Sequence, residues 1–163
     1  MPSMSEKFRE QVVIITGAGK GRGRILAQAF AERGALVAAN DISPVNLDSL
    51  VALGKGRIKA CVEDVAKKVG VQNLVKQVED DFGRIDILIN HAAVEPHVAL
   101  LDMDEWDWHR VLDVNLTGTF LTIESVGRVM REQGAGVIVN LTMPNQAEMR
   151  NEAAFSSSMK GFE

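Results

Sequence analysis

Tyrosine is absent from the 163-residue sequence, and aromatic residues make up only 5% of it. Cys61 is the only cysteine, so no disulfide can form within the chain. We expect its thiol to be buried at the end of a strand as a small apolar side chain, with a reactive thiol as the alternative. The formal net charge is −4, with acidic and basic residues interspersed. This charge pattern disfavours nucleic acid as a partner.

Long apolar runs are also missing. No stretch approaches the roughly 20 residues needed to span a bilayer, and the opening residues MPSMSEKFRE lack the apolar segment of a secretory signal. We therefore expect a cytoplasmic protein with no membrane partner. His91, His97 and His109 are not at ligand spacing on one helix, and no cysteine pair accompanies them. Loop or surface histidines are expected, and no metal site.

Apolar strands alternate with amphipathic helices along the chain. The apolar pattern predicts strands over 12–16, 35–40, 57–64, 85–90 and 137–141, and helices over 22–33, 43–53, 71–82, 102–114 and 116–133. Gly34, Gly83 and Gly134 are placed to end three of these helices. Asp102 is expected to cap the helix that follows it. The alternation implies right-handed crossovers and a doubly wound parallel sheet, in a single α/β domain spanning residues 1–163.

The segment TGAGKGRG, residues 16–23, lies between the first expected strand and the first expected helix. Gly17, Gly21 and Gly23 allow a tight turn and a close approach of the backbone to a ligand. The helix N-terminus would offer N–H groups and a positive dipole end to a pyrophosphate. A plain turn also uses glycine, but the strand before the loop and the helix after it favour nucleotide binding. The loop lacks the Gly-Lys-Ser/Thr ending of triphosphate-binding loops, which disfavours a kinase or ATPase.

Asp41 follows the second expected strand. In a dinucleotide-binding fold an acid at this point accepts hydrogen bonds from the adenosine ribose. A carboxylate there also repels a 2′-phosphate, so NAD is preferred over NADP. Lys20 and Arg22 favour the phosphorylated cofactor weakly. The alternative is a solvated turn aspartate, since Ser43-Pro44 follows it closely.

These motifs, in this order, resemble the short-chain dehydrogenase/reductase family, from about Lys7 to the last residue. The family's T-G-x-x-x-G-x-G loop is matched at 16–23, its adenine-contacting Asp-Val by EDV at 63–65, its Asn-Asn-Ala-Gly by NHAA at 90–93, and its Asn-containing helix by VLDVNLTGTF at 111–120. The resemblance implies a Rossmann-type sheet of order 3-2-1-4-5, truncated relative to the family's seven strands. It also implies NAD-dependent oxidation of an alcohol or reduction of a carbonyl, with hydride moving to or from the nicotinamide. The cofactor-binding residues that it implies are Gly17, Gly21, Arg22, Gly23, Asp41, Asp64, Val65, Asn90, Ala92 and Lys160.

The resemblance departs from the family at the active site. In such enzymes a Tyr is the general acid/base, a Lys lowers its pKa and holds the nicotinamide ribose, a Ser orients the substrate carbonyl, and an Asn supports a relay water. Asn115 and Lys160 match two of these positions. Ser156 stands at the Tyr position and Met143 at the Ser position, with Thr142 beside it as a substitute. An aliphatic hydroxyl is a far weaker acid than a phenol, so we expect turnover to be absent or residual.

Two functions of other classes remain open: a non-catalytic NAD-binding module that senses cofactor or pairs with a full-length relative, and a fragment that neither binds nor turns over. Lys160 could equally be a surface lysine, and Thr142 could satisfy local backbone groups. The sequence stops three residues after Lys160. That ending would leave the strand 137–141 as a bare edge, with uncovered apolar surface on the helix from Leu116 to Met130. We therefore expect a homo-oligomer. No residue pattern indicates the substrate.

Overall fold

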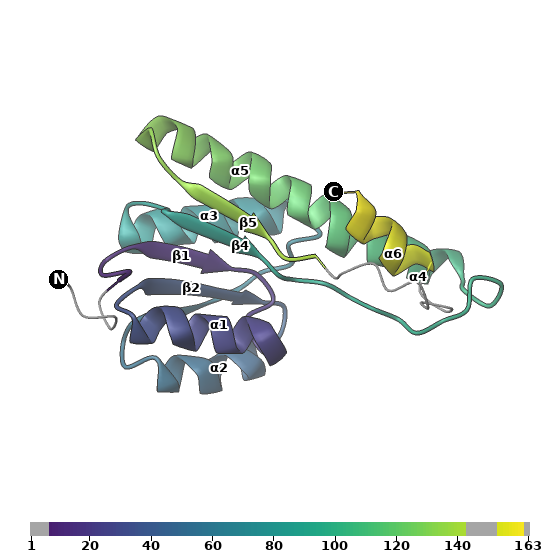
Figure 1. Ribbon diagram of the computed structural model, residues 1–163, viewed down its shortest axis with the longest axis horizontal. Helices are drawn as coiled ribbons and strands as arrows, with labels where there is room; N and C mark the ends of the chain where they lie inside the picture. Colours follow the sequence, from purple (N-terminus) through teal and green to yellow (C-terminus); the bar gives the residue numbers. More distant parts are fainter. Residues whose placement is uncertain (1–6, 143–152, 162–163) are drawn as a thin grey trace.

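A single parallel sheet organises the chain, which the computed structural model describes over residues 7–142 and 153–161. Its strands are β1 (Val12–Ile15), β2 (Leu36–Asp41), β3 (Ile58–Val62), β4 (Ile87–Asn90) and β5 (Val137–Asn140). Their order is β3-β2-β1-β4-β5. Helices α1 (Gly21–Glu32) and α2 (Pro44–Leu53) cover one face, and α3 (Lys68–Phe82) and α5 (Gly118–Gln133) cover the other (Figure 1). The predicted doubly wound α/β fold and its strand order are confirmed.

Side chains alternate between two core layers because successive residues of a strand point to opposite faces of a sheet. Val12 and Ile14 of β1 pack with α3 and α5, whereas Val13 and Ile15 pack with α1 and α2. All four are buried. A strand covered on both faces must be apolar at every position, which is why β1 is a continuous β-branched run.

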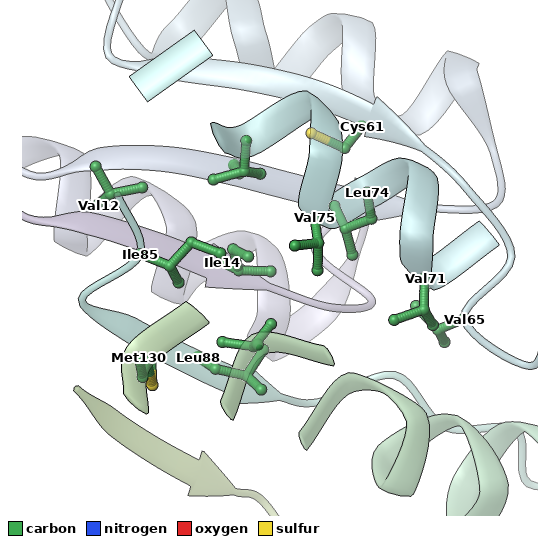
Figure 2. Close-up of a cluster of buried hydrophobic side chains, with 13 residues drawn as sticks. Val12, Ile14, Cys61, Val65, Val71, Leu74, Val75, Ile85, Leu88 and Met130 are labelled. Atoms are coloured by element: carbon green, nitrogen blue, oxygen red, sulfur yellow. The ribbon is translucent and has the colours of Figure 1, made fainter. Parts of the chain in front are cut away.

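Cys61 of β3 belongs to the layer that faces α3 and α5 (Figure 2). Burial raises the pKa of its thiol to about 12, and the nearby carboxylates Asp81 and Glu63 add to the shift. The thiol is therefore protonated at neutral pH. The expectation of a buried apolar cysteine is confirmed, because a reactive thiol needs a lowered pKa and access to solvent.

Two helix boundaries differ from the predicted ones. Helix α4 (Glu105–Leu112) is capped by Asp104, whose Oδ1 accepts a hydrogen bond of 2.7 Å from Asp107 N, so the prediction that Asp102 is the cap was wrong. The predicted break between residues 114 and 116 is also wrong. A π-helical turn, η2 (Asp113–Thr117), joins α4 directly to α5. In contrast, Gly83 and Gly134 end α3 and α5 in the left-handed conformation, as predicted.

Helix α6 (Ala153–Lys160) lies against α4 at one end of the molecule (Figure 1). Ala154 and Phe155 of α6 form a small core with Val111 of α4, separate from the two core layers on the sheet. Sequence periodicity did not predict this helix. Its place in the fold brings the serine run into contact with the helix that precedes α5.

Strand β5 is the outer strand on its side of the sheet and pairs with β4. Val137 and Val139 are exposed along it. On α5, Val126 and Met130 are buried against the sheet, while Phe120 is exposed. The expected bare edge is therefore present within the part of the chain that the structure describes. Within those same residues, no helix is long and apolar enough to cross a membrane.

Candidate cofactor-binding site

The glycine-rich loop turns from the end of β1 into α1. Gly17 and Gly21 have positive φ angles of 66° and 56°, which other residues adopt only with strain. A Cβ on Gly17 would lie 2.8 Å from Ala92 Cα, so the loop touches the chain that follows β4. A Cβ on Gly21 would meet no atom within 4 Å. The loop is therefore packed against protein at Gly17 and faces open space at Gly21, where α1 begins.

Thr16 ties this loop to the segment after β4. Its Oγ1 accepts hydrogen bonds of 3.0 Å from the backbone N–H groups of both His91 and Ala92. The Thr16 N–H in turn donates to the carbonyl of Ile89 at 3.0 Å. Residues of the two matched motifs, 16–23 and 90–93, are thereby held side by side at the carboxyl ends of β1 and β4.

Asp41, the last residue of β2, is hydrogen-bonded to the glycine-rich loop. Its Oδ2 accepts a hydrogen bond of 3.0 Å from Gly19 N, and its Oδ1 accepts one of 3.0 Å from Ser43 N. Arg24 of α1 donates to the carbonyl of Asn46 at 3.1 Å, which joins the start of α1 to α2. The carboxylate is half-buried beside the loop. Asp41 therefore takes part in a local turn and lies at the same time against the glycine-rich loop.

Three other predicted cofactor residues lie around this loop and at the end of β3. Arg22 is exposed on the first turn of α1. Asp64 Oδ1 accepts a hydrogen bond of 2.9 Å from Ala66 N, which shapes the turn after β3. Val65 is only 7% exposed and packs into the core between the sheet and α3. Most of the Val65 side chain is thus committed to the fold, which leaves little of it for a ligand.

Asn90, at the carboxyl end of β4, is hydrogen-bonded to polar side chains of β5 and α5. Its Nδ2 donates to Asn140 Oδ1 at 2.9 Å, and its Oδ1 accepts from Thr122 Oγ1 at 2.7 Å. Asn90 and Thr122 are buried. These bonds join β4, β5 and α5 at the edge of the sheet where open α/β folds place their ligands.

Asn115 lies in the π-helical turn η2 and is buried. Its Oδ1 accepts from Val94 N at 2.8 Å, and its Nδ2 donates to Val94 O at 3.0 Å and to Ser158 Oγ at 3.1 Å. Both amide hydrogens are therefore used. The side chain fixes the segment after β4 to α6, and π-helical turns of this kind are often found at functional sites.

The remaining predicted active-site residues lie on α6 and after β5. Ser156 is half-buried on α6, Lys160 is exposed on its last turn, and Thr142 is exposed after β5. Met143 lies outside the described residues. Within the serine run, Ser158 is the residue that forms a hydrogen bond with Asn115.

The sequence alone did not single out Ser158 or its hydrogen-bond partner Phe155, which is 3% exposed. Ser158 Oγ donates back to the carbonyl of Phe155 at 2.7 Å and is itself buried. The three-residue spacing of this pair, which places both on one helical face, was the available signal. It could be used only once residues 153–160 were known to be helical.

The geometry fits a dinucleotide. The site combines a glycine-rich turn open to solvent at Gly21, the N-terminus of a twelve-residue helix, and a carboxylate at the end of β2. Backbone N–H groups at a helix N-terminus bind phosphate, and a carboxylate in this position binds ribose hydroxyls. Among residues 7–142 and 153–161, no group of three or more His, Cys, Asp or Glu side chains is placed to hold a metal ion.

Comparison with known proteins agrees with this geometry. Residues 11–162 match the short chain dehydrogenase family. The chain belongs to this family. It is 38% identical over 158 residues to the dehydrogenase subunit BbsD of Thauera aromatica, covering 94% of this chain and 63% of that protein. It is 40% identical over 134 residues to the D-threitol dehydrogenase of Mycolicibacterium smegmatis, covering 80% of this chain and 52% of that one.

Solved short-chain dehydrogenases share the fold. An NAD+-bound xylitol dehydrogenase matches with a TM-score of 0.89 and 32% identity, over 96% of this chain and 62% of its own. The short-chain dehydrogenase family thus accounts for the Rossmann-type sheet and for nicotinamide cofactor use among the chain's relatives. The chain spans roughly half to two thirds of the length of the relatives it matches.

Proposed function

We propose that residues 1–163 form one NAD-binding domain of a short-chain dehydrogenase/reductase-type oxidoreductase that transfers hydride between NAD(H) and an alcohol or carbonyl substrate. The observation that carries the proposal is the hydrogen bond between the glycine-rich loop and Asp41, whose Oδ2 accepts from Gly19 N at 3.0 Å. The open turn at Gly21 supplies N–H groups for the pyrophosphate, and Asp41 supplies an acceptor for the ribose.

NAD is proposed over NADP because of the charge at Asp41. A 2′-phosphate placed beside this carboxylate would bring two anions together, and like-charge contacts at a binding site are unfavourable. Gly19 N and Ser43 N hold the carboxylate in place before any ligand binds. It is therefore fixed at the end of β2. Lys20 and Arg22 lie in the same loop and offset part of the repulsion.

We propose further that turnover is absent or residual. Bound NADH would donate the hydride, or bound NAD+ would accept it, but an alcohol proton must also move to or from a group of suitable pKa. Ser156 is an aliphatic hydroxyl, and Lys160 is exposed on α6. Both hydrogens of the Asn115 amide are already bonded to Val94 and Ser158. Loss of positioned acid/base catalysis costs roughly 10²- to 10⁴-fold in rate.

Calorimetric titration with NADH and NADPH tests cofactor binding. We expect saturable NADH binding by the wild-type chain and weaker binding of NADPH. Asp41→Ala should weaken NADH binding roughly tenfold, the effect of losing a hydrogen bond to a charged group. Asp48→Ala, on the exposed side of α2, is the matched control and should bind like wild type. If Asp41→Ala leaves the NADH affinity unchanged, the ribose role of Asp41 is refuted.

The same samples separate the alternative functions. NADH binding without turnover of alcohols or ketones favours a non-catalytic NAD-binding module that senses cofactor or pairs with a full-length relative. No binding favours an inactive fragment. Robust NAD-linked turnover would refute the proposed loss of activity.

We also propose that the chain forms a homo-oligomer, because the outward edge of β5 leaves Val137 and Val139 exposed and strand edges invite pairing. Light scattering at micromolar concentration tests this. A clean monomer would contradict it.

A further inference from the structure

His91 is the first residue after β4, and its ring lies against the glycine-rich loop. The Nδ1 atom is 3.2 Å from the carbonyl oxygen of Gly17, 74 residues earlier in the chain. The backbone N–H of the same residue donates to Thr16 Oγ1 at 3.0 Å. His91 therefore holds the first turn of the loop through its side chain and its main chain together.

The ring also fills the space that two of the loop glycines leave open. A Cβ on Gly17 would lie 3.2 Å from His91 Nδ1, and a Cβ on Gly23 would lie only 2.7 Å from it. The same Gly23 Cβ would be 2.3 Å from the Gly17 oxygen. The imidazole thus packs where the start of α1 passes closest to the first turn of the loop.

The chemistry of this contact fixes the proton on the ring. A carbonyl oxygen only accepts hydrogen bonds, so the His91 nitrogen that faces Gly17 must carry hydrogen. In the neutral ring this is the Nδ1–H tautomer, which leaves Nε2 as an acceptor. An asparagine side chain at this position could place its Nδ2–H near the same point. The amide of glutamine is one bond farther from the backbone and could not.

We propose that His91 is a positioning residue for cofactor binding. Its Nδ1–H holds the Gly17 carbonyl so that the first turn of the loop keeps the conformation that receives a dinucleotide pyrophosphate. The inference rests on the proposed function, and it assigns a cofactor-related role to a histidine that sequence spacing alone places among loop residues. Without this bond the Gly17 carbonyl loses a hydrogen-bond partner at a residue whose backbone has a positive φ of 66°.

Three substitutions test the role of the ring nitrogen. We expect His91→Ala to weaken NADH binding roughly five- to tenfold in a calorimetric titration, the effect of one lost hydrogen bond on a dissociation constant. His91→Asn should remain within about twofold of wild type, and His91→Gln should resemble His91→Ala. His109→Ala is the control, because His109 lies exposed on α4 and pairs with Glu105. The ¹⁵N shifts of the His91 ring should report the Nδ1–H tautomer.

The outcomes distinguish positioning from packing. Unchanged NADH affinity in His91→Ala would overturn the inference, even if its melting temperature fell, and so would equal affinities of the Asn and Gln variants. An Nε2–H tautomer in the free protein would overturn it as well. If the wild-type chain shows no saturable NADH binding, the proposed function itself is refuted, and the role of His91 is refuted with it.

Discussion

Replacing Gly23 by alanine tests the packing of the glycine-rich loop most directly. The added Cβ would lie 2.3 Å from the Gly17 oxygen and 2.7 Å from His91 Nδ1. An ordinary carbon–oxygen contact is about 3.3 Å, so the start of α1 and the first turn of the loop must separate by about 1 Å. The nearest atom belongs to the backbone and cannot rotate away. We expect a loss of about 2–3 kcal/mol in the free energy of unfolding, at the upper end of ordinary overpacking.

Binding should fall together with stability in this variant. A loop displaced by about 1 Å no longer aims its N–H groups at one phosphate, and each bond lost to a charged group weakens binding roughly tenfold or more. Urea unfolding and NADH titration measure the two effects separately.

Gly127→Ala on α5 is the matched control. An added Cβ there meets no atom within 4 Å, so the change should stabilise the chain by about 0.5–1 kcal/mol and leave binding unaltered. If Gly23→Ala unfolds within about 0.5 kcal/mol of wild type and binds NADH equally well, the close approach described for Gly23 is wrong.

Three further predictions concern other parts of the fold. The pKa of Cys61 is about 12 in the folded chain, above that of an unfolded cysteine. The stabilisation from keeping this thiol protonated is therefore complete below about pH 8.5. Above that pH the free energy of unfolding falls by about 1.4 kcal/mol per pH unit as the pH rises toward 12. Urea unfolding at several pH values should show this decrease in the wild-type chain and not in Cys61→Ala. Asp104→Ala should cost about 1 kcal/mol of unfolding free energy and Asp102→Ala almost nothing, because only Asp104 caps α4; equal losses would contradict this assignment. Asn115→Leu should cost about 3 kcal/mol, since it leaves the backbone groups of Val94 without their side-chain partner; a loss no larger than that of exposed Ser157→Ala would refute the reasoning.

The order of strands and helices could be predicted because it depends on local patterns. β1 is a continuous apolar run, α3 has one apolar face, and Gly83 and Gly134 stand where their helices end. The cap of α4 could not be assigned in this way. Asp102 and Asp104 are each followed three residues later by an acidic residue, so only the bond from Asp107 N identifies the cap.

The finer arrangement of the site depends on contacts between residues far apart in the chain. Asn115 takes its position from Val94 and from Ser158, which is 43 residues later. His91 takes its position from Gly17, 74 residues earlier. Spacing along the sequence carries no information about such pairs. It therefore singled out Asn115 only as part of a motif, left His91 among ordinary loop histidines, and did not single out Ser158.

The π-helical turn at Asp113–Thr117 changes the rotation of α5 about the helix axis relative to α4. A π-helical turn contains about one residue more than an α-helical turn, so the faces of α4 and α5 are offset relative to those of one uniform helix. Deleting one residue within the turn would restore the α-helical period while leaving Val111 directed at α6 and Val126 directed at the sheet. The same deletion after Gly118 would rotate the rest of α5 by about 100° and carry Met130 out of the core. Along the continuous segment from α4 to α5, a one-residue deletion is therefore expected to be tolerated better within the five residues of the turn than in α5.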